Sequence, residues 1–265
     1  MFKKQEQSWL ATPGLLQMPL QTTLNSFAVG IFRKQADFDY ISARSNYKLQ
    51  FRQQFIWAAQ QAIEKYLKAI LLFNGKSAKS YPDENGKKHK YGHDLCALCA
   101  AVKQIDYLRF QLLPENESFL KYLNEQGSNN RYLSTSSYNR GDAIQMLDSL
   151  VWHLRRYCQF IPNSDTNLEP NVSRVQKALL DFICSFPEHN YPHKFRLQGG
   201  ELEKILQAPA TNSARKTLVW ANLWYGIKRR KRVTYSPFSS TEIPPNERHW
   251  FNENMKRQLA DYIKF

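Results

Sequence analysis

The longest amphipathic stretch of the chain runs from Phe51 to Gly75 and reads FRQQFIWAAQQAIEKYLKAILLFNG. Its apolar residues recur at the three- and four-residue spacing of a helix that lays one wide face on a core. They are Phe51, Phe55, Ala59, Ala62, Ile63, Tyr66, Leu67 and Ile70, with Trp57, Leu71 and Leu72 broadening the face. The opposite face is predicted to be polar and solvated, with Gln60, Gln61, Glu64, Lys65 and Lys68. Asn74-Gly75 is a C-terminal stop, because glycine adopts the left-handed conformation at little steric cost. The pattern predicts a helix of about six or seven turns.

The rest of the sequence up to residue 162 also has patterns typical of helices. A helix is predicted to begin at Thr22 or Thr23, and its candidates for burial are Phe27, Ile31, Phe32, Phe38, Ile41 and Ala43. Three more are predicted to start near His93-Asp94-Leu95, at Pro114 and near Asp142. The segments 75–92 and 128–138 are rich in turn-forming residues and are predicted to be irregular. Because no alternating strand pattern appears, the fold class predicted is all-α, an up-and-down helical bundle.

Composition divides the chain into four parts. They are an N-terminal arm (1–21), the helical bundle (22–161), a Pro/Asn-rich linker (162–172) and a basic, aromatic-rich C-terminal region (173–265). The last part is predicted to be mostly helical, with helices near 201–207 and 213–227, and forms either a second small domain or a cap on the first. Because domains part at such linkers, we expect the bundle to fold without the C-terminal region.

The formal net charge of +14 indicates a polyanionic partner, and nucleic acid or nucleotide is the most common kind for a basic protein without a membrane anchor. Four cysteines in 265 residues do not make a disulfide scaffold, so a reducing cytoplasm is predicted. No signal peptide or membrane span is predicted. His93, Cys96 and Cys99 have a ligand-like spacing, but one helix rarely presents three ligands tetrahedrally. We therefore expect no metal and no other cofactor.

Three segments carry a family resemblance: ADFDYISAR (36–44), QQAIEKYLKAIL (60–71) and GHDL (92–95). In this order and at this spacing they resemble the HEPN family of helical bundles, over about residues 22 to 161. The family contains metal-independent ribonucleases as well as non-catalytic members that bind nucleotides or RNA. The resemblance implies a HEPN-like bundle and a homodimer.

The ribonucleases of this family share an Arg and a His with four to six residues between them, before the last long helix. Arg131 occupies the matching place, but Ser, Ser and Tyr138 stand where the histidine is expected. Arg131 can stabilise phosphate charge, whereas proton transfer near neutral pH calls for an imidazole. Tyr138, with an ordinary pKa of about 10, is a poor base. The catalytic candidates are therefore Arg131, Tyr138 and His153, the last being on the final helix of the bundle.

Several residues are predicted to contact nucleic acid or nucleotide. Arg44 and His93 belong to the resembling segments, although exposed charge pairs around Arg44 and a structural role for His93 are the simpler interpretation. The run Lys228-Arg229-Arg230-Lys231-Arg232 must face water or a polyanion. Aromatic residues flank this run (Trp220, Trp224, Tyr225 and Tyr235), as in single-strand binding surfaces. The alternative is that these aromatics belong to a core and that the charges are a solvated loop.

The leading hypothesis is a cytoplasmic, dimeric, HEPN-like protein that binds RNA or nucleotide through a basic cleft and tail without catalysis. A second hypothesis is a metal-independent ribonuclease effector of a toxin–antitoxin or phage-defence system with an atypical active site. A third is a scaffold that binds another protein through its aromatic tail.

Overall fold

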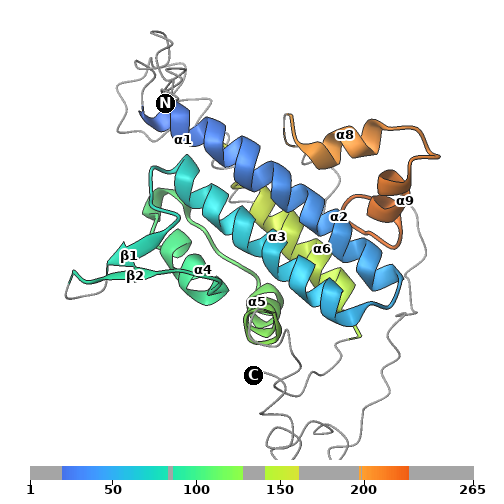
Figure 1. Cartoon of the computed structure of the whole chain (residues 1–265), viewed down its shortest axis with the longest axis horizontal. Helices are drawn as coiled ribbons and strands as arrows, with labels where there is room; N and C mark the ends of the chain where they lie inside the picture. Colours follow the sequence, from blue (N-terminus) through green and yellow to red (C-terminus); the bar gives the residue numbers. More distant parts are fainter. Residues whose placement is uncertain (1–19, 83–85, 128–140, 161–196, 198, 227–265) are drawn as a thin grey trace, which may run out of the picture.

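The computed structural model describes residues 20–82, 86–127, 141–160, 197 and 199–226. Helices dominate this part of the chain, which confirms the all-α prediction (Figure 1). They are α1 (Leu20–Phe27), the π-helical segment η2 (Ala28–Arg33), α2 (Lys34–Lys48), α3 (Arg52–Phe73), α4 (Leu95–Lys103), the 3-10 turn η3 (Asp106–Leu108), α5 (Pro114–Gln126), α6 (Ala143–Arg155), α8 (Glu201–Gln207) and α9 (Ser213–Val219). None of the described helices is both long and apolar enough to span a lipid bilayer.

Helix α3 is the central element of the bundle, as its sequence predicts. Its predicted apolar face from Phe55 to Ile70 is buried. Two details of the prediction are wrong. Phe51 and Trp57 are exposed, whereas Gln60 and Glu64 on the supposed polar face are buried. The helix is covered on more than one side, so its polar residues take part in contacts with neighbouring helices.

Helices α1, η2 and α2 follow one another without a break, and the predicted burial pattern for this stretch is wrong in part. Phe27, Ile31 and Phe38 are exposed, whereas Ala43 is buried as predicted and Phe32 and Ile41 are partly buried against the core. The other buried positions are Ala28, Arg33, Ala36, Asp37, Tyr40, Arg44 and Tyr47. The π segment explains part of the difference, because each i→i+5 turn carries one more residue than an α turn and rotates the side chains that follow. A pattern search at a constant helical period cannot detect that shift.

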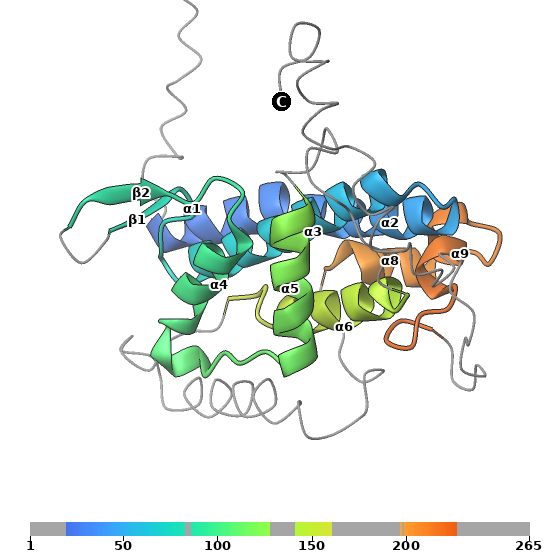
Figure 2. The same ribbon diagram turned by 90° about the horizontal axis from the view of Figure 1, so that it is seen from below.

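The helices form a bundle around α3. Helices α2 and α3 run side by side in opposite directions, and α6 packs against both (Figure 1). Helices α4 and α5 cover another side of α3, while α8 and α9 pack against α2. The C-terminal helices lie at one end of the molecule and the segment that follows α3 lies at the other, in both views (Figures 1 and 2).

The segment from Gly75 to Gly92, predicted to be a loop, contains a β-hairpin. Strands β1 (Ser80–Pro82) and β2 (Lys88–Lys90) pair antiparallel, with Tyr81 opposite His89. The Tyr81 ring lies 5.8 Å from the His89 ring and 4.9 Å from the ring of the buried Tyr91, centroid to centroid. Strands of three residues are too short for an alternating pattern to reveal them, so the sequence signal is weak.

The other helix starts are close to their predicted positions. The Asp94 carboxylate accepts a hydrogen bond from the Ala97 amide at 3.0 Å, which confirms the predicted start of α4. Pro114 is the first residue of α5, and α8 has the predicted bounds. Helix α6 and helix α9 both end before the predicted positions, at Arg155 and Val219.

The Arg155 guanidinium is completely buried and connects three parts of the chain. It forms a two-pronged pair with Asp37 of α2, at 2.8 and 2.9 Å, and another with Glu203 of α8, at 2.9 and 2.8 Å. Tyr66 of α3 donates to Asp37 at 2.6 Å. Burial alone would lower the pKa of Arg155, but the Asp37 carboxylate reverses this and holds that pKa well above its ordinary value. The group is therefore a permanent buried cation with two carboxylate partners.

The Asp37 carboxylate also accepts hydrogen bonds from backbone amides at the start of α8. The Glu201 and Leu202 amides donate to its Oδ2 atom at 3.0 and 3.3 Å. These amides belong to the first turn of α8, where backbone N–H groups have no partner within the helix. Asp37 thus caps a helix that is more than 160 residues away in the chain.

A second buried cluster of polar side chains lies next to α9 and the residues that follow it. Arg44 pairs with Asp148 of α6 and donates to the Thr217 carbonyl at 3.1 Å and to the Trp220 carbonyl. Tyr40 donates to Asp148 at 2.6 Å and accepts from the Asn222 amide at 2.9 Å. These contacts join α2, α6 and the segment after α9.

Through these two clusters, residues 197 and 199–226 pack on the bundle core. The predicted linker at 162–172 lies outside the described residues. We propose that the bundle needs the C-terminal region to fold, because removing that region would leave Arg44 and Arg155 without several of their partners. Of the two sequence-based alternatives for this region, the described residues favour a cap on the bundle.

We expect Asp37→Asn to lower the free energy of unfolding by about 3 to 5 kcal/mol, because it leaves a buried cation undercompensated. The matched control is Asp39→Asn on the same helix. Asp39 is partly exposed and pairs with Lys65, so its loss should cost less than about 1 kcal/mol. Chemical denaturation of the two variants measures the difference, and equal losses would contradict the role given to Asp37.

Candidate nucleic-acid interface

The segment after α3, which is rich in lysine, lies at the end of the molecule opposite α8 and α9 (Figure 2). We define the lysine face as Lys68 at the end of α3 together with Lys76, Lys79, Lys88 and Lys90. Lys88 and Lys90 lie on the same side of β2, since alternate residues of a strand share a face, and both are exposed. The lysine face thus takes its cations from α3, from the chain that follows it and from the hairpin.

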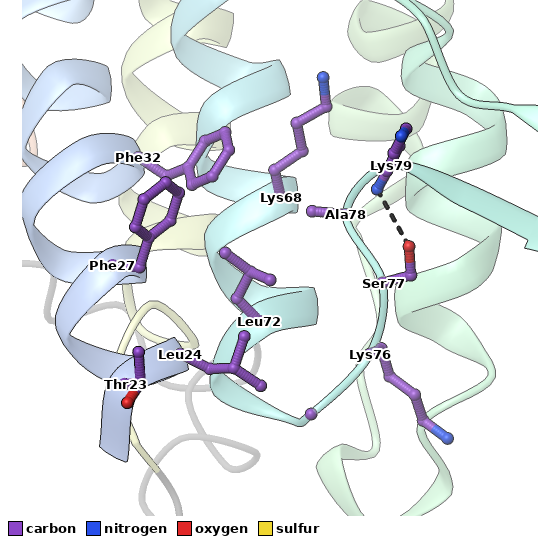
Figure 3. A pocket seen from close by; sticks show the side chains of 11 residues that line it. Thr23, Leu24, Phe27, Phe32, Lys68, Leu72, Lys76, Ser77, Ala78 and Lys79 are labelled. Atoms are coloured by element: carbon purple, nitrogen blue, oxygen red, sulfur yellow. Dashed lines mark hydrogen bonds between the residues drawn. The ribbon is translucent and has the colours of Figure 1, made fainter. Parts of the chain in front are cut away.

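A groove of about 710 Å³ lies beside the lysine face (Figure 3). Its apolar lining comes from α1 and η2 on one side and from α3 and the chain after it on the other: Leu24, Phe27, Phe32, Leu72 and Ala78. Lys68, Lys76 and Lys79 contribute to its walls. The groove therefore combines an apolar floor with cationic edges, which is the chemistry of sites for ligands with an aromatic part and an anionic part.

The lysines of the groove differ in whether a carboxylate neutralises their positive charge. Lys68 donates to the Glu64 carboxylate at 2.6 Å and to the Gly92 carbonyl at 3.3 Å. Lys76 and Lys79 are exposed and form no ion pair with any residue that the structure describes. Their charges are thus available to an anionic ligand.

The three resembling segments contact one another beside this groove. Gln60, Glu64 and Lys68 form one ridge of α3, since residues four apart lie on the same helical face. The His93 ring nitrogen Nδ1 lies 2.9 Å from the Glu64 carboxylate, and Gln60 donates to the His93 carbonyl at 3.3 Å. The ridge therefore holds the GHDL segment at the start of α4. Lys65 of the same helix pairs with Asp39 of the ADFDYISAR segment.

A smaller hollow of about 250 Å³ is lined by Gln53, Gln54, Trp57 and Gly127. Gly127 has no room for a side chain, because a Cβ atom there would lie 2.2 Å from Gln60 Oε1. The chain leaves the described bundle at this point, four residues before Arg131.

The structure accounts for three of the predicted site residues. Arg44 is completely buried in the contacts to Asp148 and the C-terminal segment, so the description of its surroundings as exposed is wrong. His93 has a half-exposed side chain and lies next to the lysine face through Lys68 and Glu64. His153 is buried and its Nε2 atom donates to the Gln111 carbonyl at 3.1 Å.

Burial, reinforced by the charge of the neighbouring Arg156, lowers the pKa of His153 to about 3. The imidazole is therefore neutral at physiological pH and is not exposed to a substrate. The candidates Arg131 and Tyr138 and the basic run Lys228–Arg232 lie outside the described residues.

The described part of the chain holds no group of three His, Cys, Asp or Glu side chains placed to bind a metal ion. Cys96 and Cys99 are free thiols on α4, and Cys99 is buried. Burial raises the pKa of Cys99 to about 11, so this side chain is a neutral thiol near pH 7.

Sequence reasoning missed the groove and most of the lysine face. The basic stretch Lys87-Lys88-His89-Lys90 was visible in the sequence but was interpreted as part of a loop. Phe27 and Phe32 were both assigned to the core, whereas both line the groove. The density of lysines between residues 76 and 90 was the available signal.

Comparison with known proteins gives one match. Residues 29–150 match the family model described as the HEPN domain. This range begins in η2, ends in α6 and contains all three resembling segments. No curated protein and no solved structure matches the chain.

Because the pKa of His153 falls from an ordinary 6.5 to about 3, the unfolded chain takes up a proton first as the pH drops. The contribution of neutral His153 to the free energy of unfolding is therefore fully present above pH 6.5. It is lost as the pH falls towards 3, by up to about 1.4 kcal/mol per pH unit. We expect His153→Gln to remove this part of the slope. Denaturant titrations of both proteins between pH 7 and about pH 5 measure it. Parallel pH profiles would contradict the buried neutral state.

Proposed function

We propose, from the HEPN domain at residues 29–150, that the protein binds RNA or a nucleotide through the lysine face and the groove, without cleaving it. The domain family supports a nucleotide- or RNA-related function in general terms. The observation that carries the finer proposal is the groove itself, where Lys76 and Lys79 stand uncompensated among the described residues beside apolar walls. A phosphate neutralised by such lysines releases condensed counterions, which favours binding.

The proposal of binding without catalysis rests on the histidines and on the motif. The position expected for the catalytic histidine after Arg131 holds no histidine. His153 cannot replace it, because it is buried and neutral. The lysine face supplies cations that can hold a phosphate backbone, but the motif at Arg131 supplies no histidine to transfer a proton.

One observation favours the rival function, a metal-independent ribonuclease effector of a toxin–antitoxin or phage-defence system. The His93 imidazole is half-exposed and its Nδ1 atom faces the Glu64 carboxylate at 2.9 Å. A carboxylate in this position orients an imidazole and fixes its tautomer, as general bases require. A cleavage assay separates the two functions.

The proposal includes three features that rest on sequence and resemblance alone. Arg131 and the run Lys228–Arg232 are proposed to contact the same ligand, and the protein is proposed to act as a homodimer.

We expect Lys76→Gln/Lys79→Gln to weaken the binding of a single-stranded RNA about tenfold at modest salt, and to reduce the salt slope by roughly 1.4 through the loss of two phosphate contacts. The matched control is Lys204→Gln/Lys216→Gln, which removes the same charge from α8 and α9 at the opposite end of the molecule (Figure 1). Fluorescence anisotropy over a range of salt concentrations measures both. An equal effect of the two double variants would assign binding to net charge alone.

We also expect no cleavage of a labelled tRNA or mixed RNA in the presence of a metal chelator, and Arg131→Ala should weaken binding only. Gel analysis of end-labelled RNA after incubation with the full-length protein checks this. Cleavage that disappears in Arg131→Ala or His93→Gln would replace the binding function with the ribonuclease function.

A further inference from the structure

The π-helical segment η2 places two phenylalanines of the groove together. Phe27 and Phe32 are five residues apart, and in an α-helix such residues point about 140° apart around the axis. Here their rings meet edge to face, with centroids 6.1 Å apart and planes at 60°. The Lys34 amide donates to the Val29 carbonyl, the i→i+5 bond of a π turn. The π segment is thus the feature that brings both rings to one wall of the groove.

This arrangement is not explained by burial in the core. Phe27 remains 52% exposed and is not part of the core, whereas Phe32 is partly buried against it. π-helical turns are rare and are found frequently at functional sites. The two rings instead face the space between η2 and the chain after α3, where Leu72 and Ala78 form the opposite wall (Figure 3).

We infer that the groove binds one unstacked base of single-stranded RNA against Phe27 and Phe32, with the flanking phosphates on Lys76 and Lys79. This rests on the proposed function and names its substrate class. A base stacked on an aromatic side chain is the common device of single-strand binding surfaces, and it is tolerant of sequence because every base has a π face. In duplex RNA the bases are stacked inside the helix and are not available to such a wall.

The lysine face favours a polymer over a free nucleotide. The cations continue from Lys76 and Lys79 along the hairpin to Lys88 and Lys90, beyond the groove. One nucleotide in the groove leaves the hairpin lysines without a phosphate, whereas a strand that crosses the groove can follow the whole row. Ser77 adds a polar group at the edge, because its Oγ accepts from the Lys79 and Ser80 amides at 3.2 Å and its hydroxyl hydrogen can point to the ligand.

The test uses the full-length protein and a fluorescein-labelled RNA dodecamer, as a single strand and as a duplex. We expect Phe27→Leu/Phe32→Leu to weaken single-strand binding about tenfold, the size of one lost stacking contact, with the salt slope unchanged. Duplex binding should not change. Phe38→Leu is the matched control, because Phe38 is an exposed phenylalanine of α2 that does not line the groove.

A second measurement does not depend on the stability of the variants. With the wild-type protein, a single 2-aminopurine in the strand reports unstacking, and we expect its fluorescence to change on binding. 5′-AMP at millimolar concentration should not displace the strand.

Each outcome is decisive. Wild-type protein that binds neither the RNA nor 5′-AMP overturns the proposed function as well. Binding that depends on Lys76 and Lys79 but is the same in the phenylalanine double variant overturns only the stacking inference. Displacement by 5′-AMP at low concentration would assign the groove to a free nucleotide, and a loss of duplex binding in the phenylalanine double variant would also contradict the inference.

Discussion

The buried guanidinium of Arg155 is the constraint on which the architecture depends. A cation without water must have carboxylate partners, and here they come from α2 and α8, which are far apart in the chain. Asp37 satisfies Arg155, the Tyr66 hydroxyl and the first amides of α8 at once. The bundle and the C-terminal segment therefore form a single core, and a change in one of them affects the other. Burial favours the neutral form of Glu203, yet Arg155 keeps the pKa of this carboxyl below its ordinary value, so the pair stays ionised.

The charges of the molecule are divided between two ends with different roles. At the end of α8 and α9, the arginines of the core are buried and paired with carboxylates or carbonyls. At the other end, the lysines of the hairpin and of the groove face solvent. Buried, paired charge specifies the fold and contributes little to the outer field, whereas exposed lysines attract polyanions. Among the described residues, Lys76 and Lys79 of the lysine face are cations of this kind, exposed and without an ion pair.

The sequence predicts the elements of this fold better than their contacts. The apolar period of α3, Asp94 at the start of α4 and Pro114 at the start of α5 are local signals, and local physics decides them. The partners of Arg44 and Arg155 are set by the packing of segments distant in the chain, and no pattern around these arginines reveals whether they are solvated. The ADFDYISAR segment was interpreted as a surface with exposed charges, although Asp37, Tyr40 and Arg44 are all buried. The groove was not predicted for a different reason: it needs a π segment and a hairpin, and neither leaves a periodic signature.

The family resemblance was predicted correctly from the same segments, and the structure explains why they occur together. Gln60, Glu64 and Lys68 hold the GHDL segment, and Lys65 holds Asp39. The most direct test of the whole account is ultraviolet crosslinking of a 4-thiouridine-labelled single-stranded RNA to the full-length protein, with the crosslinked peptides identified by mass spectrometry. The account predicts crosslinks in residues 24–32 and 76–90. Crosslinks that fall on α8 and α9 and spare the groove would contradict it.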